Sequence, residues 1–456
     1  MEKLAQDFDC QLLDAFVKKT DIGSQLNRPG IDTEPILKQI AQPVAEGGFG
    51  ITRAHDTMHI AYVSSLAATI QSKSSIQAFA NYNDSNNILP DNSTLHKELT
   101  ASLSIVHQQI APDNTDDNDP EDDEEGKETD ELEEKHQSEP PCKLLPLTAN
   151  EFINGYNQPL TGAKFNSQNL QSHLTTKAQS KINKASLSTA RKAAMTEKTT
   201  SALTTHARML AISAPGASTW ISASAFDAGT TIPNHAYKLA TRLRLGLAPQ
   251  DIMANNCHSC HLHSPRNLSL VEKNEWHHLT CMQGHGGKEI TMRHHQVVAT
   301  IERYAKLAGA VVVAEPKHSF SESNKRPDLQ IIMNHKNYLL DVTIVHPTAP
   351  SNLNHSQKLL GQAEAAERLK INKYEELSED QRCIFVPFVI ETYGGLGLKA
   401  QEFLNELSIF AIDHAMIRSR FDIVNGLRYA IACSVQRGNA LIASAGYANS
   451  LRVHRN

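Results

Sequence analysis

The sequence predicts an α/β (α+β) protein in which a small mixed sheet is flanked by helices. Three observations lead to this prediction. Residues 288–445 alternate between apolar runs of strand length and longer stretches of helical spacing, in the order α-β-β-β-α-β followed by further helices. Upstream of residue 250, apolar residues recur mostly at helical spacing. Hydrophobic residues make up 40% of the 456 residues, which is enough to build a core.

The centre of the predicted sheet is a hairpin that carries two acidic residues. Its strands cover residues 328–333 and 338–345, and residues 334–337 form the turn. Because side chains alternate across a strand, Asp328 and Asp341 can share one face while their apolar neighbours build the core on the other. Two neighbouring carboxylates attract a hard divalent cation such as Mg²⁺ or Mn²⁺, which can activate water and stabilise charge on a phosphodiester. The hairpin therefore predicts a catalytic metal site.

The remaining elements surround this hairpin. Glu315 ends the strand before it and is a candidate third carboxylate for the same metal. Arg326 flanks Asp328 and is a candidate contact for a phosphate oxygen. The other predicted elements are a helix over 288–308, a strand over 310–315, a helix over 355–376 that is rich in Ala, Glu and Lys, a strand over 384–391, and helices over 399–445.

A group of cysteine and histidine residues precedes the first of these helices. Cys257-x2-Cys260 is followed by His277-x3-Cys281, and thiolates and an imidazole at this spacing are typical of a tetrahedral structural zinc. His278 is the alternative histidine ligand, and reduced structural cysteines beside an incidental histidine are the alternative to zinc. The histidines that could compete as ligands are His258, His261 and His263.

The charge of the chain is unevenly distributed. Residues 113–139 hold fifteen acidic and two basic residues, whereas the whole chain has a net charge of −6, so the remainder carries a net charge of +7. Such an acidic block repels itself and is expected to be a disordered linker. The mildly basic remainder permits binding to nucleic acid.

A basic segment follows the acidic linker. Residues 161–210 hold eight lysine and arginine residues against one acid, and Lys177, Lys181 and Lys184 fall at helical spacing. They could form one basic face that neutralises phosphates without reading sequence. An ordinary solvated helix face is the alternative.

Cysteine usage and hydropathy indicate the compartment. The seven cysteines are not arranged as a disulfide framework, which indicates a reducing environment. The N-terminus lacks the apolar core of a signal peptide, and no run is long enough to cross a bilayer. We therefore expect a protein that is neither secreted nor in a membrane.

Together these motifs resemble the C-terminal part of non-LTR retrotransposon polyproteins that carry a zinc knuckle and a restriction-enzyme-like endonuclease of the PD-(D/E)xK type. The resemblance is good over about 210–410 and faint over 35–75. The segments that carry it besides the zinc motif and the acids are Trp220–Ala223, Leu239–Leu247, Asp341–Ser351, Val386–Gly397 and Pro43–Ile51.

The resemblance implies a fold, an activity and partners. The fold is a restriction-endonuclease-like mixed sheet, preceded by a zinc knuckle and helical regions. The activity is metal-dependent nicking of target DNA, which supplies a primer for reverse transcription; the partner is DNA, with element RNA a further possibility, and the location is the nucleus, or the cytoplasm. It implies the following domains: 1–110, a helical remnant of the post-polymerase region; 111–143, the acidic linker; 144–250, a helical and partly basic region; 251–286, the zinc knuckle; and 287–456, the endonuclease domain.

The sequence departs from the family pattern at two points. The chain contains no Tyr/Phe-x-Asp-Asp strand, so the polymerase is missing. Thr343 stands where many such nucleases carry a lysine, and the resemblance implies a lysine from the following helix instead, either Lys373, which we prefer, or Lys370. These departures favour the alternative of a decayed or domesticated protein that binds nucleic acid without polymerase or nuclease activity. A structural module of an element protein, without DNA affinity, is the third hypothesis.

Overall fold

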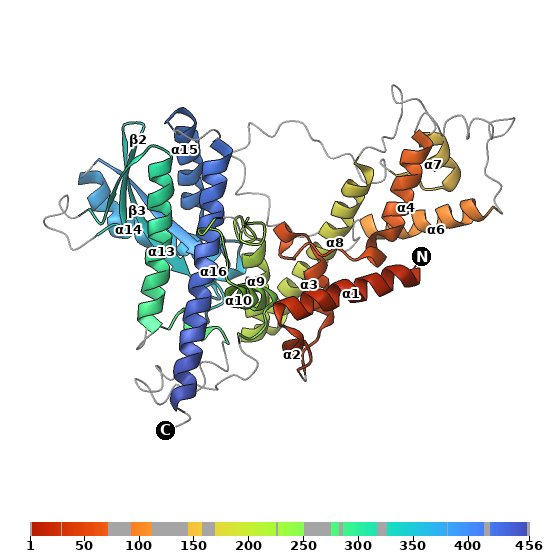
Figure 1. Ribbon diagram of the computed structural model, residues 1–456, viewed down its shortest axis with the longest axis horizontal. Helices are drawn as coiled ribbons and strands as arrows, with labels where there is room; N and C mark the ends of the chain where they lie inside the picture. Colours follow the sequence, from red (N-terminus) through yellow and green to blue (C-terminus); the bar gives the residue numbers. More distant parts are fainter. Residues whose placement is uncertain are drawn as a thin grey trace. The chain divides into compact units, whose positions relative to one another are not determined.

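The structure is a computed structural model that divides into two compact units (Figure 1). One unit comprises Met1–Leu13 and Thr52–Ala185, and the other comprises Asp14–Ile51 and Ser186–Asn456. The acidic linker and two of the predicted zinc ligands, Cys257 and Cys260, lie outside the described residues. The residues that the structure describes are 2–28, 30–71, 93–111, 145–156, 169–224, 227–249, 275–281, 286–316, 326–380, 382–414 and 420–453.

The first unit is helical, as its residue spacing predicts. Its helices are α4 (Ala54–Gln71), α6 (Thr94–Ile110), α7 (Ala149–Tyr156) and the first part of α8 (Leu170–Glu197), together with the start of α1 (Glu2–Thr20). The apolar faces of α4, α6, α7 and α8 bury a shared core. Among the described residues, no helix of either unit is long and apolar enough to span a membrane.

The second unit contains a four-stranded sheet in the order β1-β2-β3-β4. The strands are β1 (Val311–Ala314), β2 (Leu329–Met333), β3 (Lys336–Val345) and β4 (Ile384–Glu391). β1, β2 and β3 form an antiparallel meander, and β4 runs parallel to β3. The predicted mixed sheet flanked by helices is thus confirmed.

The hairpin between β2 and β3 is tighter than predicted. Met333 pairs with Lys336, so the turn consists of Asn334 and His335 alone rather than of residues 334–337. Both turn residues have positive φ, 49° and 60°. Two-residue hairpin turns require this backbone conformation because it matches the twist of the strands, and asparagine adopts it readily.

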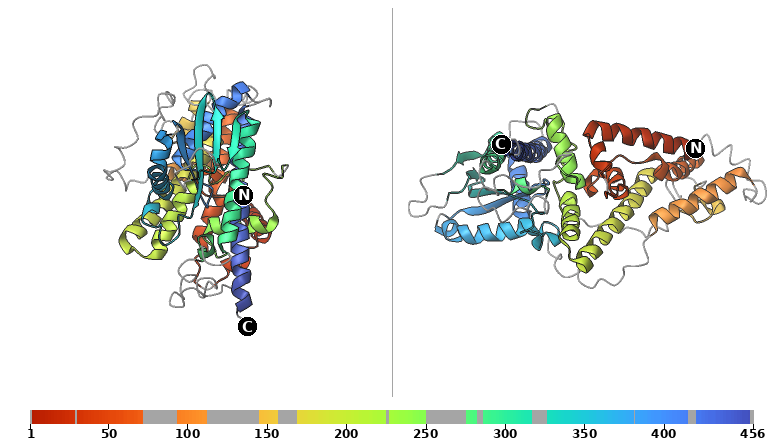
Figure 2. Two further views of the ribbon diagram at one scale, coloured as in Figure 1. Left: turned by 90° about the vertical axis from the view of Figure 1, so that its left-hand side faces the viewer. Right: turned by 90° about the horizontal axis from the view of Figure 1, so that it is seen from below.

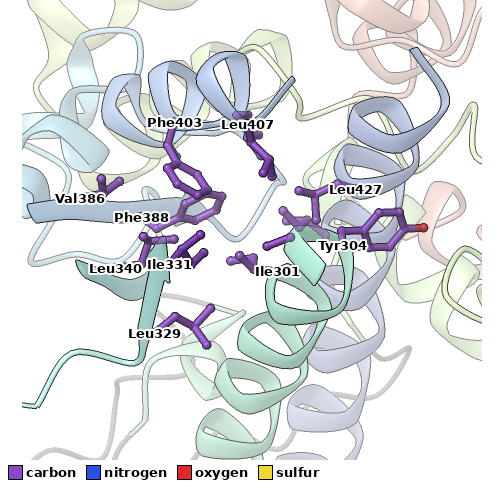
Figure 3. Close-up of a cluster of buried hydrophobic side chains, with 14 of the residues drawn as sticks. Ile301, Tyr304, Leu329, Ile331, Leu340, Val386, Phe388, Phe403, Leu407 and Leu427 are labelled. Carbon is purple, nitrogen blue, oxygen red and sulfur yellow. The ribbon is translucent and has the colours of Figure 1, made fainter. Parts of the chain in front are cut away.

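Helices cover both faces of the sheet (Figure 2). On one face, α13 (Gly286–Leu307), α15 (Leu398–His414) and α16 (Arg420–Val453) bury the larger core, in which Ile331, Leu340 and Phe388 from the strands meet Ile301 and Leu407 from the helices (Figure 3). On the other face lies α14 (Gly361–Asp380). This alternation follows from the period of two in the strands, where Val386, Phe388 and Ile390 face one side and Phe385 and Val389 the other.

The long helix α16 packs beside α13 (Figure 1). Three glycines of α16 each lie close against a large side chain. An added Cβ at any of them would come within 3.0 Å of that side chain. A Cβ at Gly426 would lie 3.0 Å from the Tyr304 ring, and one at Gly438 would lie 2.3 Å from Cγ of Arg293. A Cβ at Gly446 would lie 2.4 Å from the His278 ring. The glycines therefore let α16 approach its neighbours closely.

The rest of the second unit joins segments that are far apart in the sequence. Its helices are α2 (Gly23–Leu26), α3 (Glu34–Ala41), η1 (Val44–Glu46), α9 (Thr200–Ser213), α10 (Asn234–Leu245), η3 (His277–Leu279) and η4 (His355–Gln357). Gln39 of α3 donates a hydrogen bond to the carbonyl of Arg244 on α10, and the Phe49 ring packs against Trp220. Residues 14–51 thus fold with 186–456, so the compact units cross the predicted domain boundaries.

Candidate active site

The two acids of the hairpin adjoin the same cross-strand pair. Leu329, the first residue of β2, pairs with Leu340; Asp328 directly precedes Leu329, and Asp341 directly follows Leu340. The Asp328 N–H donates to the carbonyl of Leu340 at 2.9 Å, which ties the chain before β2 to β3. The structure therefore brings the two predicted catalytic acids together.

Asp341 is held by helix α14. Its side chain is 8% exposed; Nζ of Lys370 lies 2.5 Å from Oδ2, and the Tyr374 hydroxyl donates to Oδ1 at 2.7 Å. Burial and this hydrogen bond to Asp341 raise the pKa of Tyr374 far above its usual range. Tyr374 therefore stays protonated and acts as a fixed donor to the acid.

Asp328 is held by β3 and by helix α13, which packs on the opposite face of the sheet from α14. Its Oδ2 accepts a hydrogen bond from the N–H of Val342 at 2.6 Å and lies 3.2 Å from Nε2 of His294. The side-chain hydrogen bond to Asp328 raises the pKa of His294, although partial burial acts in the other direction. Both acids act electrostatically on His294 and on Tyr374, which is consistent with their closeness.

The two candidate lysines of α14 differ in position. Lys370 reaches Asp341, whereas the Lys373 ammonium lies over the Tyr374 ring, 4.9 Å from its centroid. Helical spacing explains the difference, because Ala363, Ala366, Lys370 and Tyr374 form one stripe that faces the sheet. The geometry thus favours Lys370 over Lys373, the lysine preferred from the sequence.

Glu315 and Arg326 lie at the edge of this site. Glu315 is exposed, and its N–H donates to the carbonyl of Asp328 at 2.9 Å, so its backbone adjoins the acid. Arg326 is also exposed, and its carbonyl oxygen lies 3.1 Å from the Tyr374 hydroxyl, whose single hydrogen it shares with Oδ1 of Asp341. The backbone of Arg326 therefore borders the same tyrosine that holds Asp341.

The two carboxylates are the oxygen donors that a hard cation would use here, and both oxygens of Asp341 already face a donor, Oδ1 the Tyr374 hydroxyl and Oδ2 the Lys370 ammonium. Among the described residues, no group of three or more histidine, cysteine or acidic side chains is placed to hold a metal. Within this part of the chain, Asp328 accepts hydrogen bonds through Oδ2 alone, so Oδ1 is left for another ligand. Mg²⁺ needs only one or two carboxylates, since it keeps several waters and binds substrate phosphates.

The structure describes half of the predicted zinc set. His277 and the buried Cys281 lie at either end of a short turn that includes η3, whereas Cys257 and Cys260 lie outside the described residues. The ring of His278 packs against Gly446 of α16, which gives this histidine a packing role. The zinc site and its ligand His277 remain predictions.

The three lysines of the predicted basic face differ in their surroundings. Lys184 is exposed and Lys177 is half-buried. Nζ of Lys181 donates to the carbonyl of Gln108 at 3.0 Å, in the last turn of α6. A lysine there satisfies a carbonyl without an intrahelical partner and complements the helix dipole. Lys181 thus has a structural role that its spacing did not predict.

A buried carboxyl group lies beyond this site, at the end of β4. Glu391 is 2% exposed, its Oε2 has no hydrogen-bond partner among the described residues, and burial raises the pKa of this carboxyl to about 8. The folded chain therefore keeps a proton that the unfolded chain releases near the ordinary value of 4.5. Stability from this group is complete below pH 4.5 and is lost as the pH rises toward 8.

We expect Glu391→Gln to flatten this pH dependence. Over pH 5 to 8 the free energy of unfolding of the parent should fall more steeply than that of the variant, by up to about 1.4 kcal/mol per pH unit. Urea unfolding followed by circular dichroism at each pH measures it. Glu402→Gln, at a carboxylate that is 59% exposed on α15, is the control. Equal slopes for Glu391→Gln and the parent would contradict the expectation.

Comparison with known proteins found no matching family model and no similar curated protein.

Proposed function

We propose that this protein is a metal-dependent DNA endonuclease of a non-LTR retrotransposon, with a restriction-endonuclease-like core that nicks target DNA to prime reverse transcription. The observation that carries the proposal is that Asp328, directly before β2, and Asp341, in the middle of β3, adjoin the same cross-strand pair, and that Lys370 contacts Asp341. The element order α13-β1-β2-β3-α14-β4 supports the same core. The retrotransposon origin rests on the sequence resemblance alone.

Each side chain of the site has a role in phosphodiester hydrolysis. Asp328 and Asp341 bind the divalent cation, and Tyr374 holds Asp341 in place. The cation supplies Lewis acidity and a water of lowered pKa. Lys370 stabilises negative charge that develops on the phosphate. The exposed Arg326 and Lys373, the second of which lies over the Tyr374 ring, contribute further positive charge that favours the approach of a phosphate backbone.

One observation favours a second candidate function. The Lys370 ammonium neutralises Asp341 within the structure, and a lysine that stays there occupies an oxygen that the metal needs. A decayed nuclease that binds nucleic acid through its basic surfaces, without cleavage, agrees with this arrangement. The two candidates differ in whether the acids are needed for activity.

Nicking of supercoiled plasmid by the full chain tests the proposal. With Mg²⁺ or Mn²⁺ we expect relaxed circles from the parent and none from Asp328→Asn/Asp341→Asn, whose side chains keep the size of the originals. Glu402→Gln on α15 is the control and should nick like the parent. Parent and double variant that nick equally would refute the assignment of the acids. Salt-dependent gel shifts from both proteins, without nicking by either, would establish the second candidate.

A further inference from the structure

His294 contacts both acid-bearing segments of the candidate site, the residue before β2 and the middle of β3. Its Nε2 lies 3.2 Å from Oδ2 of Asp328 and 3.1 Å from the carbonyl oxygen of Val342, the residue after Asp341. A carbonyl oxygen accepts hydrogen bonds and does not donate them, so Nε2 must carry a hydrogen. That N–H is shared between Asp328 and Val342. His294 therefore joins the side chain of one acid to the backbone beside the other.

The same Val342 completes the arrangement. Its N–H donates to Oδ2 of Asp328 at 2.6 Å, while its carbonyl accepts from His294. Oδ2 thus receives two donors, which fixes the rotation of the carboxylate. Among the described residues Oδ1 receives none, so it is the oxygen left for a metal.

The position of His294 is itself fixed by the residue before it. The Arg293 side chain is 2% exposed and its Nη1 donates to Oδ1 of Asn439 on α16 at 2.7 Å. It lies against Gly438, where a Cβ would come within 2.3 Å of Cγ. Arg293 therefore anchors α13 one residue from His294, and a rigid helix presents the imidazole. His295, the next residue, is exposed.

We propose that His294 is a positioning residue for metal binding: through its Nε2–H it holds Oδ2 of Asp328 so that Oδ1 is presented to the cation. This proposal rests on the proposed function, because it concerns the same metal. A residue that orients a metal ligand in this way contributes to affinity even though it does not touch the metal, and its loss costs about 10- to 100-fold in affinity.

Binding of Mn²⁺ alone, measured by calorimetry on the full chain, tests the proposal. Binding that disappears in Asp328→Asn/Asp341→Asn defines the site. We expect His294→Leu to weaken that binding by about tenfold or more. We expect His294→Gln, whose Nε2 keeps a donor near the same place, to stay within about threefold of the parent, well inside that range. His295→Leu makes the same chemical change on the adjacent, exposed residue and should bind like the parent.

The outcomes separate the two proposals. If the parent binds no Mn²⁺ that depends on the acids, the proposed metal site fails, and the role of His294 fails with it. If the parent binds but His294→Leu binds equally well, only the role of His294 is overturned. Weak binding by both His294→Leu and His294→Gln would also overturn it, because the donor would then not be what matters. Thermal melting shows whether each variant is folded. If His294→Leu is not folded, the Mn²⁺ affinity of His294→Gln decides whether the hydrogen-bond donor at this position supports metal binding.

Discussion

Lys370→Met should reduce nicking by about 10²- to 10³-fold, the loss typical of removing one group that stabilises transition-state charge. Lys370 is the lysine that the structure brings to Asp341, at 2.5 Å, with a side chain that is 27% exposed. Methionine keeps the length of the stem and its packing while removing the charge. Initial rates of plasmid relaxation at saturating Mg²⁺ measure the effect.

Lys373→Met is the matched control, three residues along the same helix. Its ammonium lies over the Tyr374 ring and not on Asp341, so we expect a loss of less than about tenfold, since a single exposed cation–π contact contributes only about 0.5–1 kcal/mol. A large loss in Lys373→Met with little loss in Lys370→Met would reverse the assignment and support the lysine preferred from the sequence. Equal, small losses in both would remove the catalytic lysine from the proposal.

Arg244→Met should destabilise the second unit by about 3–5 kcal/mol, because it leaves several buried acceptors without a donor. Arg244 is 2% exposed, and burial lowers its pKa to about 9. Its guanidinium donates to the Val44 carbonyl and to Oγ of Ser218, each at 2.8 Å, and to the Gly48 carbonyl at 3.3 Å. It therefore holds the 43–51 segment on the rest of the unit.

Lys238→Met on the same helix α10 is the control for this variant. Lys238 pairs with Asp21 at 3.2 Å, with side chains that are 38% and 63% exposed, and such surface pairs contribute about 0–1 kcal/mol. Urea unfolding followed by circular dichroism compares the two. A loss for Arg244→Met no larger than that for Lys238→Met would show that residues 43–51 are not held by this arginine.

The sequence predicted the sheet well because its signals are local. The strand over 384–391 has the predicted bounds, since an apolar run of strand length fixes both ends. The closeness of Asp328 and Asp341 could be predicted because they lie on one hairpin, where spacing along the chain sets spacing in space. The predicted turn of four residues was too long, because two residues with positive φ can close a hairpin on their own.

The other contacts of the site are long-range, and local pattern alone did not assign them. His294 lies 34 residues from Asp328 along the chain. A signal was nevertheless present, because His294 falls between Ile290 and Val297 in the apolar stripe of its helix, where a polar residue needs a partner. Helical spacing likewise places Lys370 in line with Tyr374. No pattern predicted that Lys181 donates to the end of another helix.

The three glycines of α16 make the spacing of residues along this helix as important as their identity. Gly426 and Gly438 lie against Tyr304 and Arg293 of α13, and Gly446 lies against His278 of η3. An α-helix turns about 100° per residue. One residue inserted between Gly438 and Gly446 would keep the contact of Gly438 with Arg293 but rotate Gly446 away from His278. A substitution on α16 changes the contacts of one position, whereas a change in its length changes the direction of every residue beyond it. Homologous chains should therefore differ in the loops around this helix and keep the intervals between its glycines.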